Sequence, residues 1–136
     1  MIDFCNSIIF VRFLESITGI PGIIQDPYLL GGGMHSTLNN GFLKLHTDFN
    51  GHTKLKLYRR LNLLIFLNQD WQDNWEGHLL LVKKNDKELE IRKKIAPEIN
   101  TSVIFNTEKK YSRSSIPYEI TKQHFKRFNC NILLYQ

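Results

Sequence analysis

Residues 41–49, GFLKLHTDF, are the most informative stretch of this 136-residue sequence. They predict a strand over 42–48 that runs into a turn. Because side chains along a strand alternate between two faces, we expect His46 and Asp48 to lie on the same face. An imidazole and a carboxylate two residues apart can therefore converge on one point in space.

A converging His–Asp pair supplies two of the three protein ligands in the facial set that holds non-haem Fe(II). The full set has two histidines and one carboxylate, and it leaves coordination positions open for substrates and O2. A His-x-Asp pair also arises by chance in many sequences. The rest of the chain has to supply the context and the third ligand.

Before this stretch, the sequence indicates a single helix. Residues 6–18 place apolar side chains, among them Ile9, Phe13 and Ile17, at helical spacing. Asn6 or Ser7 is available as the N-terminal cap, and the Gly-x-Pro-Gly segment after residue 18 ends the helix. The three glycines at 31–33 are interpreted as a turn with positive φ, because no phosphate-loop motif follows them.

The remainder of the chain is rich in short apolar runs separated by turn residues. Besides 42–48, strands are predicted at 60–67, 77–83, 88–92, 101–106 and 127–135. Many short strands favour a sandwich or barrel, so the expected fold class is mainly β with an N-terminal helix.

The composition is that of one soluble globular domain, which we expect to span residues 1–136. Hydrophobic residues make up 42% of the sequence and charged residues 23%, both ordinary values. The net charge is +5, but the basic residues come in short groups, such as Arg59 with Arg60, without a nucleic-acid motif. We interpret these groups as solvated faces and expect no nucleic-acid partner.

The cysteines and the apolar segments of the sequence indicate the cellular compartment of the protein. Cys5 and Cys130 form neither a disulfide framework nor a metal-ligand spacing. The N-terminal segment lacks the features of a signal peptide, and no apolar run approaches the ~18 residues that a membrane span requires. We therefore expect a cytoplasmic protein with no membrane partner.

Several segments, in order, resemble the prolyl 4-hydroxylase-like branch of the 2-oxoglutarate/Fe(II)-dependent oxygenases. The matching segments are 30–35, 41–49, 57–68, 70–71, 75–79 and 103–107. The resemblance implies a double-stranded β-helix (a jelly-roll or cupin-like fold), in which two facing antiparallel sheets hold iron at their mouth. Since the chain starts almost at the helix, it implies that the family's N-terminal elements are truncated here.

The resemblance also implies a role for each matching residue. His46 and Asp48 would be iron ligands, and Arg127 would bind the distal carboxylate of 2-oxoglutarate through its planar guanidinium. Phe66 stands where the family commonly has a Tyr whose hydroxyl assists that arginine. The implied cofactors are Fe(II) and 2-oxoglutarate, with ascorbate as an optional addition. The implied reaction is hydroxylation of a C–H bond in a peptidyl (prolyl) residue or a small molecule.

The sequence departs from the family at the distal iron-binding histidine. Counting from neighbouring motifs places that position at Arg113 or Ser114, and neither these residues nor Ser112 is a histidine. His124 lies three residues before Arg127, so on one regular strand the two would face opposite sides. The histidines at 35, 52 and 78 match family positions that do not bind iron, and we interpret them as turn or surface residues.

Two functions therefore stay open at this point. The chain is either a 2-oxoglutarate-dependent dioxygenase, or a degenerate, non-catalytic family member that keeps the fold as a binding or structural domain. The retained His46, Asp48 and Arg127 favour the first, and the missing histidine favours the second.

Overall fold

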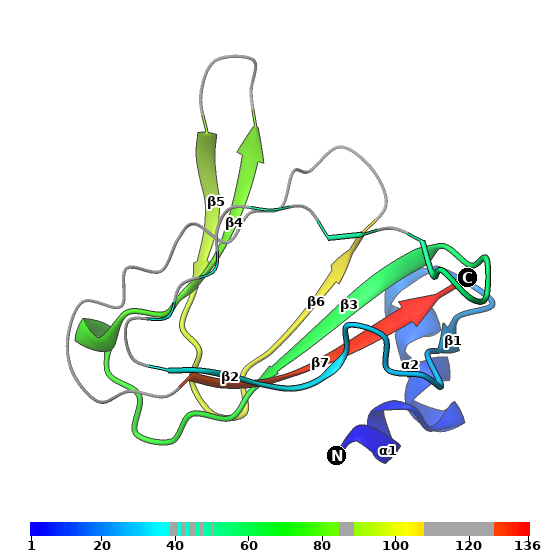
Figure 1. Cartoon of the computed structure of the whole chain (residues 1–136), viewed down its shortest axis with the longest axis horizontal. Helices are drawn as coiled ribbons and strands as arrows, with labels where there is room; N and C mark the ends of the chain where they lie inside the picture. Colours follow the sequence, from blue (N-terminus) through cyan, green and yellow to red (C-terminus); the bar gives the residue numbers. More distant parts are fainter. Residues whose placement is uncertain are drawn as a thin grey trace.

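The structure is a computed structural model, and it describes residues 1–38, 41, 43, 46, 48–49, 51–84, 89–107 and 127–136. Within these residues the chain is mainly β (Figure 1). The helices are α1 (Ile2–Cys5), α2 (Ile8–Thr18) and a 3₁₀ helix (Asp73–Trp75). The strands are β1 (Ile24–Gln25), β2 (Gly33–Thr37), β3 (Arg59–Phe66), β4 (Leu79–Lys84), β5 (Leu89–Ile95), β6 (Ser102–Asn106) and β7 (Arg127–Tyr135).

The helix predicted at 6–18 and the strands predicted after residue 60 are confirmed, with small differences at their ends. The short elements α1, β1 and β2 were not predicted. No helix in the described part of the chain is long and apolar enough to cross a membrane.

Five of the described strands form one antiparallel sheet with β3 near its centre (Figure 1). β3 pairs with β6 on one side and with β7 on the other. The outer edge of β7 pairs with β1 near its end and with β2 near its start. β4 and β5 form a separate two-stranded antiparallel sheet. The side chains of β3 are buried or half-buried on both faces of the sheet, and this explains its run of apolar residues.

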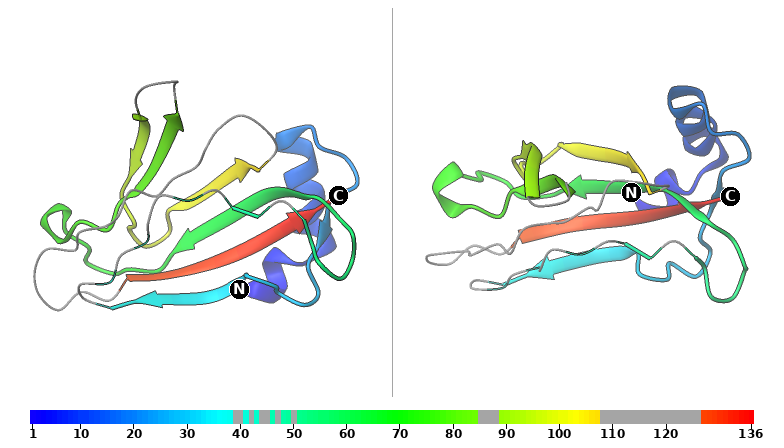
Figure 2. Two further views of the ribbon diagram at one scale, coloured as in Figure 1. Left: turned by 45° about the horizontal axis from the view of Figure 1, so that its top comes forward. Right: turned by 90° about the horizontal axis from the view of Figure 1, so that it is seen from above.

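One face of the sheet packs against the N-terminal helices, which lie at the end where β3 begins and β7 ends (Figure 2). The buried side chains of this core are Cys5, Val11, Leu14, Ile20, Ile23, Leu61, Leu63, Cys130, Ile132 and Leu134. Fully burying a side chain such as Leu14 contributes about 1.5–3 kcal/mol relative to leaving it exposed. This core therefore fixes α2 to the sheet.

The opposite face of the sheet carries a second apolar cluster. Leu64 and Phe66 of β3 pack there with Leu79 of β4. Asn62 has the same parity along the strand and is also buried. Side chains along β3 thus alternate between two faces of the sheet. One face packs against the helices, and the other carries Asn62 beside apolar side chains.

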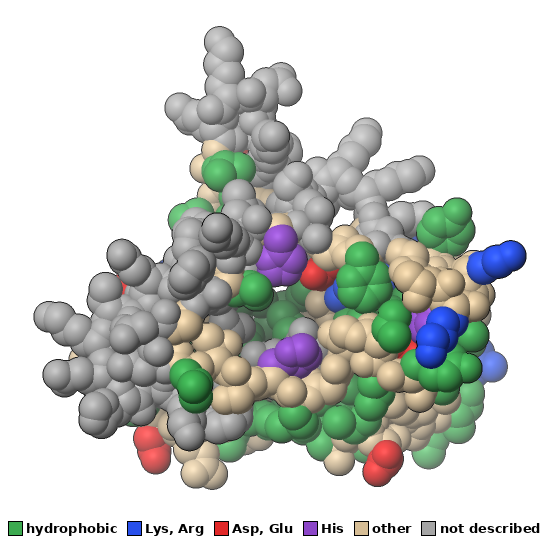
Figure 3. All heavy atoms as spheres, in the orientation of Figure 1, with side chains coloured by type: hydrophobic (Ala, Val, Ile, Leu, Met, Phe, Trp, Pro, Cys, Tyr) green, Lys and Arg blue, Asp and Glu red, His purple; other side chains and the backbone are tan. Residues whose placement is uncertain are grey.

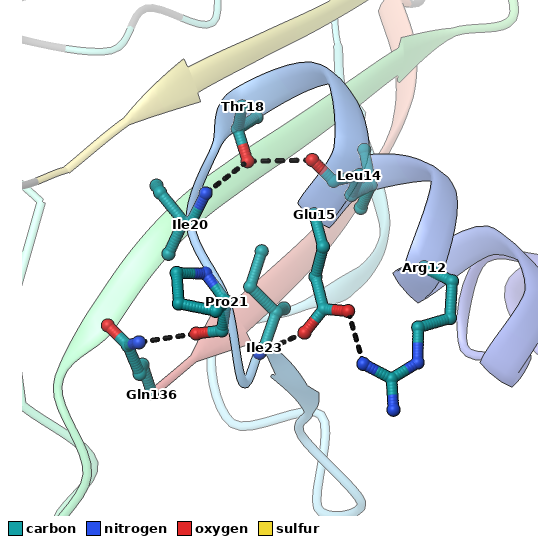
Figure 4. Close-up of polar contacts among 8 residues, drawn as sticks. All are labelled: Arg12, Leu14, Glu15, Thr18, Ile20, Pro21, Ile23 and Gln136. Atoms are coloured by element: carbon teal, nitrogen blue, oxygen red, sulfur yellow. Dashed lines mark hydrogen bonds and ion pairs between the residues drawn. The ribbon is translucent and has the colours of Figure 1, made fainter.

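The ends of α2 follow the predicted signals. Ser7 Oγ accepts a hydrogen bond from the backbone N–H of Phe10 at 3.3 Å, and Gly19 adopts the left-handed conformation at the C-terminus (φ 68°). Beyond the helix, the backbone N–H of Ile23 donates to Glu15 Oε1 at 2.9 Å (Figure 4). The Ser7 bond satisfies a backbone N–H at the start of α2, and the Glu15 bond directs the chain after the helix towards β1.

The strand predicted at 42–48 is wrong for the residues that can be assessed. Leu43, His46 and Asp48 belong to no strand. Both edges of β3 are already paired, with β6 and with β7, so Asp48 cannot join β3 through backbone pairing. Asp48 instead contacts β3 through its side chain, which accepts hydrogen bonds from Arg59 and Asn62.

The turn predicted at the three glycines is confirmed. Gly31 and Gly33 have φ of +78° and +102°, a region that favours glycine, and they lead into β2. A Cβ on Gly31 would come within 3.0 Å of the Phe49 ring. The glycine therefore lets the turn approach the residue that follows Asp48.

A buried Asp–His pair ties this turn to the loop that precedes β3. Asp26 Oδ1 accepts from His52 Nε2 at 3.1 Å, and the carboxylate also accepts from the backbone N–H groups of Tyr28 and Leu30 at 2.9 and 2.6 Å. His52 Nδ1 accepts from two backbone N–H groups of its own loop. Since Nδ1 is an acceptor, Nε2 carries the proton that is donated to Asp26.

We predict that Asp26→Asn lowers the free energy of unfolding by about 2–4 kcal/mol. The amide would turn an N–H towards one of the donors that Asp26 now accepts, and a buried donor would lose its partner. Urea denaturation measures the change. The control is Asp73→Asn, because Asp73 also bonds a histidine (His78) but its side chain is 81% exposed. Equal losses in the two variants would contradict a structural role for the buried pair.

Candidate functional site

The carboxylate of Asp48 is held against β3 by two side-chain donors. Asp48 Oδ2 accepts from Arg59 Nη2 at 3.3 Å and from Asn62 Nδ2 at 3.2 Å. The Asp48 side chain is 18% exposed and that of Arg59 is 3% exposed. Hydrogen bonds to an ionised group in such surroundings are stronger than neutral ones. The two donors therefore fix the orientation of the carboxylate.

The second carboxylate oxygen faces His46. His46 Nε2 lies 3.5 Å from Asp48 Oδ1, and the imidazole is 44% exposed. The two side chains thus converge as the sequence predicted, although no regular strand holds them. Two donor atoms that share one metal ion at about 2.1 Å each are roughly 3–3.5 Å apart. The observed spacing suits a shared cation.

The donor set fits Fe(II) in part. An imidazole and a carboxylate are two of the ligands that non-haem Fe(II) takes. Within the described residues, no group of three His, Cys, Asp or Glu side chains is placed to hold a metal. The expected distal position at Ser112–Ser114 and the alternative donor His124 lie outside the described residues.

Arg59 supports the same segment in two ways. Its guanidinium lies 4.9 Å from the centre of the Phe49 ring, and Nη1 donates to the Phe49 carbonyl at 3.4 Å. Burial lowers the pKa of Arg59, while the charge of Asp48 acts in the opposite direction. Arg59 therefore holds both Asp48 and Phe49 against the start of β3.

Neither of these two supporting residues was predicted from the sequence. Arg59 was expected on a solvated basic face, which is wrong, because the residue is buried. Asn62 was not singled out. A polar residue inside the apolar run of β3 is the signal that could have found it, because a buried amide is costly unless it is hydrogen-bonded.

Phe66 and Arg127 lie towards the other end of these strands. Phe66 is fully buried in the second apolar cluster. In the register of β3 and β7, Phe66 pairs with Asn129. Arg127 lies two residues before Asn129 and pairs with Thr37 of β2. The backbone of Arg127 is thus near that of Phe66, on the last strand as expected. The side chain of Arg127 lies outside the described part of the structure.

The other described histidines differ in their surroundings. His35 is exposed on β2, as interpreted. His52 and His78 were interpreted as turn or surface residues; both are buried, so the surface alternative is wrong, while His52 does bond the turn at 53–55. His78 Nε2 lies 2.9 Å from Asp73 Oδ1, and the ring meets Trp71 edge-on. Burial and the charge of Lys94 lower the pKa of His78, although Asp73 opposes them. Each of the two buried imidazoles therefore has a carboxylate partner, Asp26 for His52 and Asp73 for His78.

A hollow opens over the middle of the five-stranded sheet (Figure 3). Hydrophobic side chains lie inside it, and two histidines border it, one with an acidic and a basic side chain nearby. An apolar depression with a few polar groups at its edge is the usual form of a small-molecule site.

Comparison with known proteins identifies the family. The model of the 2OG-Fe(II) oxygenase superfamily matches residues 32–133, which include β2 to β7 up to Leu133 and the His46–Asp48 pair. No curated protein matches the chain. Fe(II) and 2-oxoglutarate are the cofactors that this family implies. Because the match covers most of the sequence, the chain belongs to the 2OG-Fe(II) oxygenase superfamily.

Proposed function

We propose that this protein is a dioxygenase of the prolyl 4-hydroxylase-like branch, which binds Fe(II) and 2-oxoglutarate and hydroxylates a C–H bond. The observation that carries the proposal is the convergence of His46 and Asp48, 3.5 Å apart, within the family match. The substrate class is a peptide, with prolyl residues as the first candidates, or a small molecule.

We also propose that the chain adopts the double-stranded β-helix of the family. An antiparallel sheet with β3 near its centre supports a double-stranded β-helix. So does the second apolar cluster, which packs β4 against the sheet face opposite the helices. The site then lies at the mouth of the facing sheets, with the Asp48 carboxylate mostly buried and the His46 imidazole open to solvent.

In this proposal the chain's residues hold and orient the iron site. His46 Nε2 and Asp48 Oδ1 are the metal donors. Arg59 and Asn62 bond Asp48 Oδ2, so they position the carboxylate with one oxygen towards the metal. Bound iron with 2-oxoglutarate supplies the oxidising chemistry that amino-acid side chains lack.

The 2-oxoglutarate site lies towards Phe66 and Arg127. The guanidinium of Arg127 pairs with the distal carboxylate of the cofactor, since a planar fork suits a carboxylate that is leaving water. The ring of Phe66 packs against the cofactor chain without the hydroxyl that a Tyr would provide. The register that brings Arg127 close to the partner of Phe66 supports this assignment.

One observation favours a second candidate function. The described residues contain no third side chain placed to complete the metal site. A family member with two protein ligands would bind metal weakly and serve as a non-catalytic binding or structural domain. Metal affinity and turnover distinguish the two functions.

We predict that Asn62→Leu weakens Mn²⁺ affinity about tenfold, because the metal-binding carboxylate loses a donor that orients it. Stability should change little, since Asn62 Oδ1 is buried without a hydrogen-bond partner in the described structure and the leucine removes it. Calorimetric titration and urea denaturation measure the two effects. Ile65→Val, on the other face of β3, is the control. Unchanged affinity in Asn62→Leu would remove Asn62 from the site.

We predict opposite effects of two substitutions on 2-oxoglutarate affinity, measured in the presence of Mn²⁺. Arg127→Ala should weaken binding more than tenfold, because the carboxylate loses its partner in a closed site. Phe66→Tyr should strengthen binding by about 1 kcal/mol, or roughly fivefold, through one new hydrogen bond. Binding that neither change affects would place the cofactor elsewhere.

The experiment that tests the proposed function is 2-oxoglutarate-dependent succinate formation by the purified chain with Fe(II). With two protein ligands we expect little succinate, but more than His46→Ala produces. A histidine introduced at Ser112, Arg113 or Ser114 should raise Mn²⁺ affinity and succinate formation. Binding of metal and 2-oxoglutarate without any succinate would favour the non-catalytic function. Failure to bind either would contradict both.

A further inference from the structure

The apolar arc of α2 is wider than the sheet can cover. Val11 and Leu14 are buried against the core. Ile9, Phe13 and Ile17, which follow one another at four-residue spacing, are 50–76% exposed. A surface helix needs an apolar stripe only about 100° wide. Only part of the apolar surface of α2 is therefore buried in the core, and the rest is exposed to solvent.

The outward stripe continues onto α1. The Phe10 ring lies 5.8 Å from that of Phe13 and 5.3 Å from that of Phe4, measured between ring centres. Phe4 is itself 61% exposed. We call the surface formed by Phe4, Ile9, Phe13 and Ile17 the helix stripe. With bulky side chains at least half exposed, it presents apolar area on the order of 500 Å². Patches of this size on soluble proteins mark interaction sites.

The charged side chains of α2 beside the helix stripe are already paired. Arg12 and Glu15 are the only charged residues of α2, and Arg12 Nη1 lies 2.6 Å from Glu15 Oε2 (Figure 4). The hydrogen bonds from Arg12 and from the backbone of Ile23 lower the pKa of Glu15, so it stays ionised. A partner whose charged side chains are also paired would meet no net charge on α2.

We propose that the helix stripe is the contact through which two copies of this chain form a symmetric dimer. Side chains spaced four residues apart form a ridge, and matching ridges of two helices interdigitate. A two-fold contact uses the same patch on both copies, so an apolar stripe with paired charges meets a complementary surface. About 500 Å² of apolar area per copy approaches the ~800 Å² per partner of a standard interface.

The composition of α2 argues against a membrane surface as the partner. Interfacial helices carry several Lys or Arg residues on the polar face, where they meet anionic headgroups. α2 has one basic residue, which an acidic one neutralises. A second copy needs no such charge.

Sedimentation equilibrium of the full chain between roughly 1 and 100 μM tests the proposal. The expected mass rises to twice the 16.0 kDa of one chain. The variant Ile9→Glu/Phe13→Glu should stay at the monomer mass, because glutamate keeps the helix but places charge in the contact. Ile91→Glu is the control, since Ile91 of β5 is 53% exposed and lies outside the helix stripe. Its mass should follow that of the wild type.

Three results would overturn the dimer. The first is a wild-type chain that stays monomeric over this concentration range. The second is a double variant that dimerises as well as the wild type, while its circular dichroism shows intact helix. The third is a monomer that co-sediments with phosphatidylcholine vesicles through the stripe, which would assign the stripe to lipid.

Discussion

The bond between the Asp48 carboxylate and β3 is the interaction on which the site depends. Both edges of β3 are already paired with other strands, so Asp48 meets β3 through side chains and not through backbone pairing. Arg59 and Asn62 do this through one carboxylate oxygen, and Arg59 also bonds the backbone of Phe49. The other oxygen is then directed at His46. A converging His–Asp pair is thereby formed by residues that lie outside the described strands, and side chains of β3 orient its carboxylate.

The alternation of β3 makes this arrangement possible. Leu61 and Leu63 point into the core that α2 covers, while Leu64 and Phe66 form the cluster on the other face. One strand therefore anchors the helix and supports the site. The helix in turn carries more apolar surface than the sheet can bury, as the exposed Ile9, Phe13 and Ile17 show. In the proposed dimer, the second half of this surface is buried against its copy.

Local patterns predicted what depends on local physics. The helix, the turn at Gly31 to Gly33 and the strands after residue 60 follow from periodicity and turn chemistry, and the structure decides for Ser7 between the two predicted caps. The strand at 42–48 was wrong for its described residues; Asp48 reaches β3 through its side chain, because both edges of β3 are already paired. The burial of Arg59 and His52 was missed for a similar reason, since their partners Asp48 and Asp26 are distant in sequence. His46 and Asp48 do converge, but not through the strand alternation from which this was predicted, because neither residue lies in a strand.

The central claim is that His46 and Asp48 share one metal ion. Anomalous diffraction at the manganese edge, from crystals of this chain grown with Mn²⁺ and 2-oxoglutarate, tests it most directly. The account predicts one strong anomalous peak within bonding distance of His46 Nε2 and Asp48 Oδ1, with 2-oxoglutarate beside it. A manganese peak bonded to neither residue, or no peak at saturating Mn²⁺, would contradict it.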